Sequence, residues 1–510
     1  MAKLTLLKAE RPSLDKLASV FTEALNVARR ILECERELPA LLDAIAGGFV
    51  EPGASGALTR GKFEILPTGR NFYAVDPRTL PTPAAWEVGV KTAEKVLDYY
   101  LEKHGRYPEN VGHVLWSIDA YRADGEQLAQ ILYLLGVRPT WAPDGAVQGL
   151  EVIPLSELGR PRIDCTVRIS GIVRDTLPNY PYIIDDAVEK VVVLDEPLDM
   201  NYVRKHYVEY VKELVQLGRS FEEARTAARY RVFCSPPGSY GAGVNYAVEA
   251  SAWRSDQDLA KTWVQWAGYA YGKGFHGAKA HDVLVLALRS VDAVSRNHES
   301  DEFDLLGCCC YFAYHGGFLN AARTVSGRDV EAIYVDTRDL SRLDVRDVKV
   351  EIERVVRSKL LNPAWMEEMK KHGYRGANEF SKKILHLYGW SATTKLVDQW
   401  VFDELARTYV LDEEMRKWFE QHNVWALEEI ARRLIEAAER GLWKPPSELL
   451  GQLRETYAEL EGILEEDVVA GGERQGGSID VYTAEDVEHW SGSLKEVESL
   501  WSRLRQGRGS

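Results

Sequence analysis

Residues 111–116, VGHVLW, form a short apolar run between WEVGVKTAEKVLDYYLEKHG (86–105) and GEQLAQILYLLG (125–136). Both flanking stretches carry apolar residues at helical spacing, whereas the run between them has the length and composition of a buried strand. Further strand-like segments occupy 137–142, 149–155 and 163–170, and helical spacing resumes near Tyr180. This alternation predicts an α/β fold built on a mainly parallel sheet with helices on both faces.

The carboxyl ends of these strands are the places where the predicted sheet would bind a ligand, because ligands of open α/β sheets sit beyond those ends. The ends fall at residues 117–124 and 170–175, which include Asp119 and Arg174. Residues 84–197 contain neither GxGxxG nor GxxxxGK[ST]. The region therefore has no dinucleotide fingerprint and no phosphate-binding loop.

Composition and charge narrow the class of protein. The chain has 510 residues, of which 45% are hydrophobic and 28% charged, and a formal net charge of −15. This length predicts several domains with ordinary cores, and the acidic balance argues against a nucleic-acid partner.

No apolar run approaches the ~18 residues of a membrane helix, and the N-terminal MAKLTLLKAERP is too polar for a signal peptide. We expect a cytoplasmic protein without a membrane span.

Changes in periodicity divide the chain into five expected regions. Amphipathic helices in 1–46 precede a glycine- and proline-rich loop and a βαβ domain in 47–198. A mixed α/β region in 199–345 is followed by a mostly helical domain in 346–462. The last region, 463–510, is expected to hold a flexible linker and a short helix.

A proline- and glycine-rich loop interrupts the helical pattern of the third region. It is CSPPGSYGAGVN, residues 234–245, and its polar members include Ser239, Tyr240 and Asn245. Proline fixes φ, and glycine permits positive φ and a close approach of the backbone to a ligand. Such a loop can aim several N–H and hydroxyl groups at a ligand. A tight strand-to-helix connection without a ligand has the same composition.

A second segment with little periodicity runs from residue 47 to 83. Arg60, Arg70 and Asn71 lie among its turns, next to the aromatic Phe72 and Tyr73. A loop of this length in a folded protein is usually functional or disordered. Its composition favours anion binding and stacking, the alternative being an ordered connector.

An acidic cluster, RNHESDEFD (296–304), follows an apolar element. Its imidazole and carboxylate groups include His298, Glu299, Asp301 and Asp304. So many ligand atoms in nine residues suit a hard or borderline cation. A solvated turn would show the same spacing.

The six cysteines do not have the spacing of a zinc site, and a chain without a secretion signal is not expected to use disulfides. Cys308, Cys309 and Cys310 are consecutive. If they lie on a strand, neighbouring side chains point to opposite faces, so that only Cys308 and Cys310 can share a ligand. Ordinary packing is the favoured interpretation of this run.

Taken together, several long stretches resemble the large subunit of the cobaltochelatase and magnesium chelatase family. NHESDEFDLL and YHGGF look nearer the cobaltochelatase branch, and GWSATT nearer the magnesium branch. The resemblance covers about residues 47–443, in the family's order. The stretches that carry it are VEPGASGALTRGKFEILPTGRNFYAVDP (50–77), VGHVLWSIDAYRADGEQLAQIL (111–132), GLEVIPLSELGRPRIDCTVRISGIVRD (149–175), CSPPGSYGAGVN (234–245), RNHESDEFDLLG (296–307), LLNPAWMEEMKKHGYRGANEF (360–380), GWSATTKLVDQWVFDE (389–404) and ALEEIARRLIEAAERGLW (426–443).

The resemblance implies a protein that binds a tetrapyrrole for ATP-dependent insertion of Co²⁺ or Mg²⁺, as in cobalamin-type biosynthesis. It implies that ATP is hydrolysed by separate AAA+ subunits, which act with an integrin-like metal-binding partner. His298 and Glu299 are then catalytic candidates, and Asp301 and Asp304 candidate metal ligands. The expected contacts to the ring are Arg60, Arg70, Asn71, Arg174, Ser239, Tyr240 and Asn245.

The chain also departs from the family. Members are normally more than twice as long, the match is to their C-terminal half, and their His-Gly-x-x-Glu-type motif has no counterpart here. We therefore expect a separate subunit to supply the other half. A truncated or repurposed homologue, acting as a non-catalytic tetrapyrrole carrier or assembly subunit, is the alternative.

Overall fold

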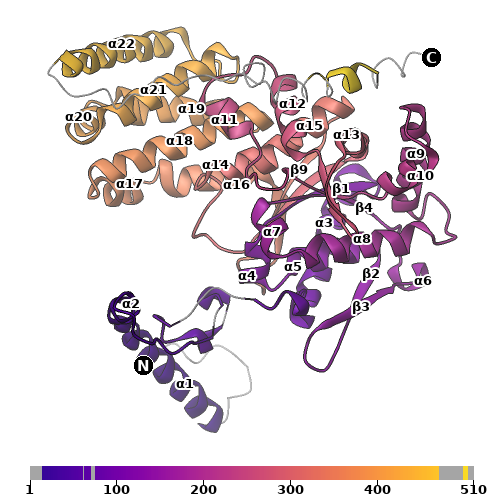
Figure 1. Cartoon of the computed structure of the whole chain (residues 1–510). Coiled ribbons are helices and arrows are strands. Elements are labelled where there is room, and N and C mark those ends of the chain that lie inside the picture. Colours follow the sequence, from indigo (N-terminus) through magenta and orange to yellow (C-terminus); the bar gives the residue numbers. More distant parts are fainter. Residues whose placement is uncertain are drawn as a thin grey trace. The chain divides into compact units, whose positions relative to one another are not determined.

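A computed structural model describes residues 14–54, 56–60, 62–70, 75–469, 495 and 498–503. The chain forms two compact units (Figure 1). The first consists of Met1–Pro77 with Ala120–Asp124, and the second of Arg78–Asp119 with Gly125–Ser510. No helix among the described residues is both long and apolar enough to cross a bilayer.

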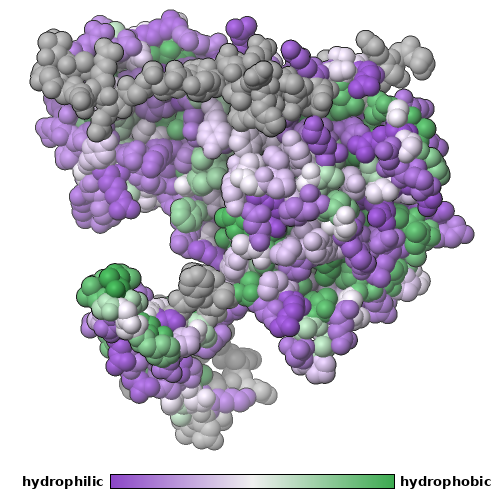
Figure 2. Space-filling model, viewed as in Figure 1, coloured by the Kyte–Doolittle hydropathy of each residue, from purple (hydrophilic) through white to green (hydrophobic). Residues whose placement is uncertain are grey.

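The first unit begins with the helices expected in residues 1–46. These are α1 (Leu14–Leu32) and α2 (Glu37–Ile45), joined by a 3₁₀ turn. α2 buries none of its residues, and its apolar side chains are visible on the surface of this unit (Figure 2). The segment after α2 forms short turns fixed by local contacts, such as the 2.9 Å bond from Gly53 N–H to the Arg70 carbonyl.

The second unit is built on an eight-stranded sheet in the order β10-β9-β8-β1-β4-β5-β6-β7. The five central strands, from β9 to β5, are parallel, and β10, β6 and β7 pair antiparallel with their neighbours. The strands are β1 (Asn110–Leu115), β4 (Asp164–Ile169), β5 (Val232–Cys234), β6 (Tyr269–Gly272), β7 (Phe275–Lys279), β8 (Ala293–His298), β9 (Glu331–Asp336) and β10 (Asp344–Asp347).

Helices cover both faces of this sheet, as Figure 1 shows. Side chains alternate along a strand, so that Ala293 packs against α3 on one face while Val294 joins the larger core on the other. The first face carries α3 (Pro83–His104), α5 (Glu126–Leu135) and α8 (Asn179–Val192). The second carries α9 (Tyr202–Gln216), α12 (Asp256–Ala267), α13 (His281–Ser290) and α15 (Gly317–Ser326). The predicted α/β fold is confirmed.

Two predicted strands do not join the main sheet. β2 (Val137–Trp141) and β3 (Val147–Val152) form a separate antiparallel hairpin. The turn between them spans only Ala142–Ala146, and a parallel pairing would need a crossover of a dozen residues or more. The sequence predicts a mainly parallel sheet for residues 84–197, and this pair lies outside that sheet as an antiparallel hairpin.

The rest of the second unit is helical. Small helices α6 (Leu155–Leu158), α7 (Gly171–Thr176), α10 (Phe221–Ala227), α11 (Val244–Glu249) and α14 (Cys309–Tyr311) come between strands in chain order. Most of another small helix, α4 (Ile118–Ala123), belongs to the first unit. The C-terminal layer comprises α16 (Val348–Val355), α17 (Pro363–Lys370), α18 (Tyr374–Thr394), α19 (Gln399–Leu405), α20 (Glu413–His422), α21 (Val424–Glu439) and α22 (Ser447–Val469). Residues 389–394, GWSATT, form the last turns of α18, where Gly389 lets Phe312 pack against the helix backbone.

The five-region division of the chain stays a prediction. β4 and β5 pair in one sheet although the expected boundary near residue 198 lies between them. The expected linker falls mainly on residues 470–494, outside the described part of the chain.

A buried ion-pair cluster joins β4 to α9 and to Arg231, the residue before β5. The Asp164 carboxylate accepts a bond from Arg231 Nε at 2.7 Å and lies 2.8 Å from His206 Nδ1. All three side chains are buried. Although burial alone would raise the pKa of Asp164, its Arg231 and His206 partners lower it below the ordinary value. The cluster is thus charged, and its members depend on one another.

Asp164→Asn should destabilise the protein by about 3–5 kcal/mol, because it leaves a buried arginine without its counter-charge. Chemical denaturation followed by circular dichroism measures the change. Asp195→Asn is the matched control, since Asp195 is exposed and only pairs with Arg204 at the surface, where such pairs contribute about 0–1 kcal/mol. Equal stability of the two variants would contradict this role of Asp164.

Candidate functional site

The sheet has its topological switch point between β1 and β8. From β1 the chain continues to β4 on one side, and it returns later to β8 on the other side. Connections leave such a point in opposite directions, which opens a crevice beyond the carboxyl ends of the two strands. β1 ends before Trp116, and β8 ends at His298.

A buried guanidinium occupies this edge. Arg296 of β8 packs against two aromatic rings that also contact each other, with its guanidinium carbon 4.2 Å from the ring centre of Trp116 and 4.3 Å from that of Tyr311. Cation–π contacts of this kind are strongest where water is excluded, and Arg296 is only 3% exposed. Tyr311 belongs to α14, so three elements meet at the guanidinium.

Several buried polar atoms at this edge have no hydrogen-bond partner among the described residues. They are Arg296 Nη2, both amide atoms of Asn297, His298 Nε2 and Trp116 Nε1. Native proteins leave few buried polar atoms without a partner, yet three consecutive residues of β8 each carry at least one such atom. Polar atoms in this state are available to a ligand, another polypeptide or ordered water. The edge is therefore the candidate functional site.

His298 is a neutral imidazole in this environment. Burial, together with the charges of Arg296 and Arg338, lowers its pKa well below the ordinary value. Arg296 Nη1 lies 3.4 Å from Nδ1, and because a guanidinium can only donate, Nδ1 accepts and Nε2 carries the proton. His298 thus presents an N–H donor, and it would act as a base or metal ligand only after this tautomer changes.

Asp119, which the sequence places at a strand end where a ligand is expected, is a second candidate. Its carboxylate accepts bonds from Gln127 N–H at 2.7 Å, Leu128 N–H at 3.3 Å and Tyr180 O–H at 3.1 Å. Burial raises its pKa to about 7, and the charge of Glu299 adds to the rise. A carboxyl group that titrates near neutrality is suited to proton transfer.

Its position at a strand end is the sequence feature that indicates a role for Asp119. Spacing alone does not distinguish Asp119 from Asp124, whose carboxylate pairs with Lys62 at 2.7 Å. Glu299, which the sequence did single out, is buried close enough to Asp119 to affect its titration.

Asp301 and Asp304 do not gather with His298. Asp301 is half-exposed and pairs with Arg338 at 2.5 Å and with Arg354 at 3.0 Å. Asp304 is buried and pairs with Lys359 and with Lys383, the latter at 3.1 Å. Burial opposes ionisation of Asp304, but the two lysines lower its pKa. Both carboxylates would have to leave these cations before they could bind a metal ion, and their role as ligands stays a prediction.

The loop 234–245 is held by arginines from neighbouring elements. Arg174 Nη1 donates to the carbonyls of Ser235, Pro236 and Ser239 at 3.2, 2.7 and 2.9 Å. Arg168 Nη2 donates to the carbonyl of Gly241 at 2.9 Å. Arg174 thus positions the loop, and the substrate contact predicted for it stays untested.

The other predicted loop residues occupy different environments. The Tyr240 hydroxyl donates to Asp175 at 2.5 Å, and its ring stacks on the Arg174 guanidinium while half of its surface remains exposed. The Ser239 hydroxyl donates to the Pro236 carbonyl at 3.1 Å. Asn245 is half-buried in the first turn of α11.

Glycine is required in this loop at Gly243. Its φ of +76° favours glycine, and a Cβ there would lie 2.4 Å from the ring of Trp266. The composition of the loop thus reflects close packing within the protein as well as any ligand contact.

The remaining predicted ring contacts belong to the first unit. Arg60 ends a 3₁₀ turn there, and the backbone of Arg70 pairs with Gly53. Asn71 lies outside the described residues. The contacts predicted for these three residues stay predictions.

Arg174→Lys should loosen the loop 234–245, because a single ammonium cannot reproduce the forked contacts of the guanidinium. Loss of about 1.4 kcal/mol would make chymotrypsin cleavage after Tyr240 roughly tenfold faster under conditions where opening is rapid. Arg225→Lys on the exposed surface of α10 is the control and should leave the rate unchanged. Equal rates for both variants would contradict the positioning role.

Asp119→Asn should change how stability depends on pH. A carboxyl whose folded-state pKa is raised from 3.8 to about 7 binds its proton more tightly when folded, so stability falls as pH rises between those values. The variant lacks this fall. Its free energy of unfolding minus that of the unmodified chain should therefore rise with pH up to about pH 7 and then stay constant. Denaturation at a series of pH values measures it.

Tyr180→Phe provides a second arm of that test. It removes an O–H donor that favours the charged carboxylate, so the fall in stability should extend to higher pH. A pH-independent difference between Asp119→Asn and the unmodified chain would overturn the assignment.

Comparison with known proteins shows which family this chain resembles. The family model described as CobN/Magnesium Chelatase matches residues 4–450. An uncharacterised protein of Methanocaldococcus jannaschii is 52% identical over 88% of this chain and 36% of its own length. The aerobic cobaltochelatase subunit CobN of Pseudomonas aeruginosa is 40% identical over 84% of this chain and 34% of its own length.

A solved structure agrees with the sequence comparisons. The catalytic subunit of cobaltochelatase from Mycobacterium tuberculosis superposes with a TM-score of 0.79 at 40% identity, over 84% of this chain and 36% of that one. The chain spans about a third of the length of the relatives it matches, a smaller share than the half expected from the sequence. The chain belongs to the CobN/magnesium chelatase family.

Proposed function

We propose that this chain supplies part of the tetrapyrrole site of an ATP-dependent metal chelatase, at the carboxyl edge between β1 and β8. The observation that carries the proposal is the row of buried, unpartnered polar atoms in Arg296, Asn297 and His298. A polar ring substituent would pair with such atoms, and buried arginine favours carboxylate arms in particular. Trp116 and Tyr311 would offer apolar surface beside the ring.

The reaction needs a group that takes up pyrrolic protons as the metal enters the ring. Asp119 suits this task, because its pKa of about 7 lets it accept and release a proton near neutral pH. Glu299 is the second carboxyl group of the same edge and would share the proton. His298 would donate its Nε2–H to the ring or its arms rather than act as the first base.

We favour Co²⁺ as the metal that is inserted. Support comes from the relatives that are cobaltochelatase subunits. Mg²⁺ is the second candidate, since the family includes magnesium chelatases.

The complete reaction would involve other polypeptides. We propose a separate subunit corresponding to the rest of the longer relatives, an AAA+ ATPase that hydrolyses ATP, and an integrin-like metal-binding subunit. The enzyme would be a ligase that forms nitrogen–metal bonds. The six free cysteines are consistent with a reducing compartment, and we place the complex in the cytoplasm.

Arg296→Gln should weaken tetrapyrrole binding about 10- to 100-fold, because a charge-assisted contact contributes roughly 1.5–3 kcal/mol. Titration of the chain, alone and with the remaining large-subunit polypeptide, with a metal-free hydrogenobyrinate-type ring or protoporphyrin measures binding by the shift of the ring's absorption. Arg296→Lys keeps the charge and should lose less. Arg225→Gln on the exposed surface is the matched control.

Two outcomes would overturn parts of this proposal. Failure of both preparations to bind a ring, or unchanged binding by Arg296→Gln, would exclude the β1/β8 edge as the site. Ring binding without insertion of Co²⁺ or Mg²⁺, in the presence of ATP and all partner subunits, would assign the chain as a non-catalytic tetrapyrrole carrier.

A further inference from the structure

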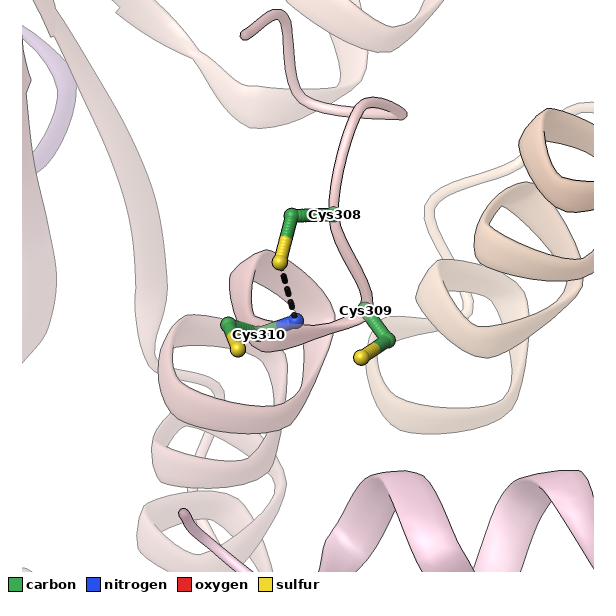
Figure 3. Close-up of side chains that lie close together, drawn as sticks. All are labelled: Cys308, Cys309 and Cys310. Carbon is green, nitrogen blue, oxygen red and sulfur yellow. Dashed lines mark hydrogen bonds between the residues drawn. The ribbon is translucent and has the colours of Figure 1, made fainter. Parts of the chain in front are cut away.

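Three consecutive cysteines bring their sulfur atoms together at the start of α14. The Sγ atoms of Cys308, Cys309 and Cys310 all lie within 4.8 Å of one another. Figure 3 shows the three side chains close together at the start of the helix. In the described part of the chain, no other group of three or more cysteine, histidine or acidic side chains has this spacing. All three thiols are free and half-buried.

The convergence follows from the backbone at the start of the helix. Cys308 is extended, with φ −148° and ψ 138°, and the helix begins at Cys309. The Cys308 side chain therefore turns back over the first turn, where its Sγ accepts the Cys310 N–H at 3.4 Å. The expectation that the run lies on a strand, with only Cys308 and Cys310 on one face, is wrong.

Two polar side chains from other helices border the thiols. Glu249 of α11 is hydrogen-bonded to Cys309. His386 of α18 lies close enough to Cys308 to act on it electrostatically. The His386 Nδ1 atom is 2.8 Å from the Leu306 carbonyl. Because a carbonyl oxygen can only accept, Nδ1 carries the proton, and Nε2 of the neutral ring keeps a lone pair. Metal-binding histidines are usually fixed by this kind of bond to a carbonyl.

The three thiols would bind a metal ion as thiolates. The thiolate is the form of cysteine that binds metal ions, and a cation among the three sulfurs would favour loss of their protons.

We propose that Cys308, Cys309 and Cys310 form a thiolate site for a single borderline or soft d-block cation of the Co²⁺ and Zn²⁺ class. Metal–sulfur bonds of about 2.3 Å at tetrahedral angles place sulfurs about 3.8 Å apart, so rotation about the side-chain bonds is sufficient to close the group. Three metal–sulfur bonds form, three thiol protons leave to solvent, and no electron is transferred. His386 Nε2 is the candidate fourth ligand. This site is independent of the proposed tetrapyrrole function.

Titration of the metal-free, reduced full chain with Co²⁺ under anaerobic conditions tests the site directly. We expect sulfur-to-cobalt charge-transfer absorption in the near ultraviolet and intense tetrahedral d–d bands in the visible, saturating at one ion per chain. Zn²⁺ should abolish the bands, and excess Mg²⁺ should not, because thiolates discriminate against hard cations. A thiol count before the titration establishes that the cysteines are reduced.

Variants identify the ligands. Cys308→Ser, Cys309→Ser and Cys310→Ser should each weaken Co²⁺ binding more than about tenfold, and the triple variant should lose the charge-transfer band. His386→Gln should weaken binding about 10- to 100-fold. Cys34→Ser, at another half-buried free cysteine, is the matched control and should change nothing. Circular dichroism verifies that each variant is folded.

Three results would overturn the proposal. They are a reduced chain that shows no charge-transfer band, a band that survives the triple substitution, and a band that disappears in Cys34→Ser. The single substitutions keep the test decisive if the triple variant does not fold.

Discussion

Parallel pairing of β1 with β4 on one side and with β8 on the other is the constraint on which the site depends. Because all three strands run in the same direction, their carboxyl ends meet at one edge of the sheet. Residues that are far apart in sequence, such as Trp116 and Arg296, are brought into contact there. Without this pairing, Arg296 would not pack against Trp116 and Tyr311. Glu299 would also not lie close enough to Asp119 to raise its pKa.

The partners of the charged side chains distinguish residues with a structural role from candidates for ligand binding. Arg174, Asp301 and Asp304 engage partners within the protein, and their contacts stabilise a loop and the polar surroundings of β8. Arg296 and His298, by contrast, keep buried polar atoms that the described chain does not satisfy. In an acidic protein with net charge −15, a buried arginine is the feature that could still attract an anionic ring substituent.

Much of the architecture could be predicted from periodicity. The strands at 111–116 and 163–170 and their flanking helices lie where the pattern places them, because burial on a parallel sheet requires uninterrupted apolar runs. The pairing of β2 with β3 could not be predicted, because a short apolar run does not indicate which strand it pairs with. The small residues of GWSATT allow α18 to pack closely on Phe312, which is a tertiary requirement that periodicity does not reveal.

The site was harder to predict than the fold. His298, Asp301 and Asp304 are neighbours in sequence, but the chain turns after β8 ends and sends them to different partners. Asp119 and the converging cysteines depend on burial and on the backbone angles at a helix start, neither of which spacing reveals. Membership of the family, by contrast, could be inferred from long motifs, because these preserve the order and identity of many residues at once.

The central claim is that a tetrapyrrole binds at the edge between β1 and β8. An experimental structure of the chain with a metal-free ring, bound alone or together with the remaining large-subunit polypeptide, tests it most directly. We predict ring substituents within hydrogen-bond distance of Arg296 Nη2, the Asn297 amide or His298 Nε2. A ring bound elsewhere, with those atoms still unpartnered or paired only to polypeptide, would contradict the account.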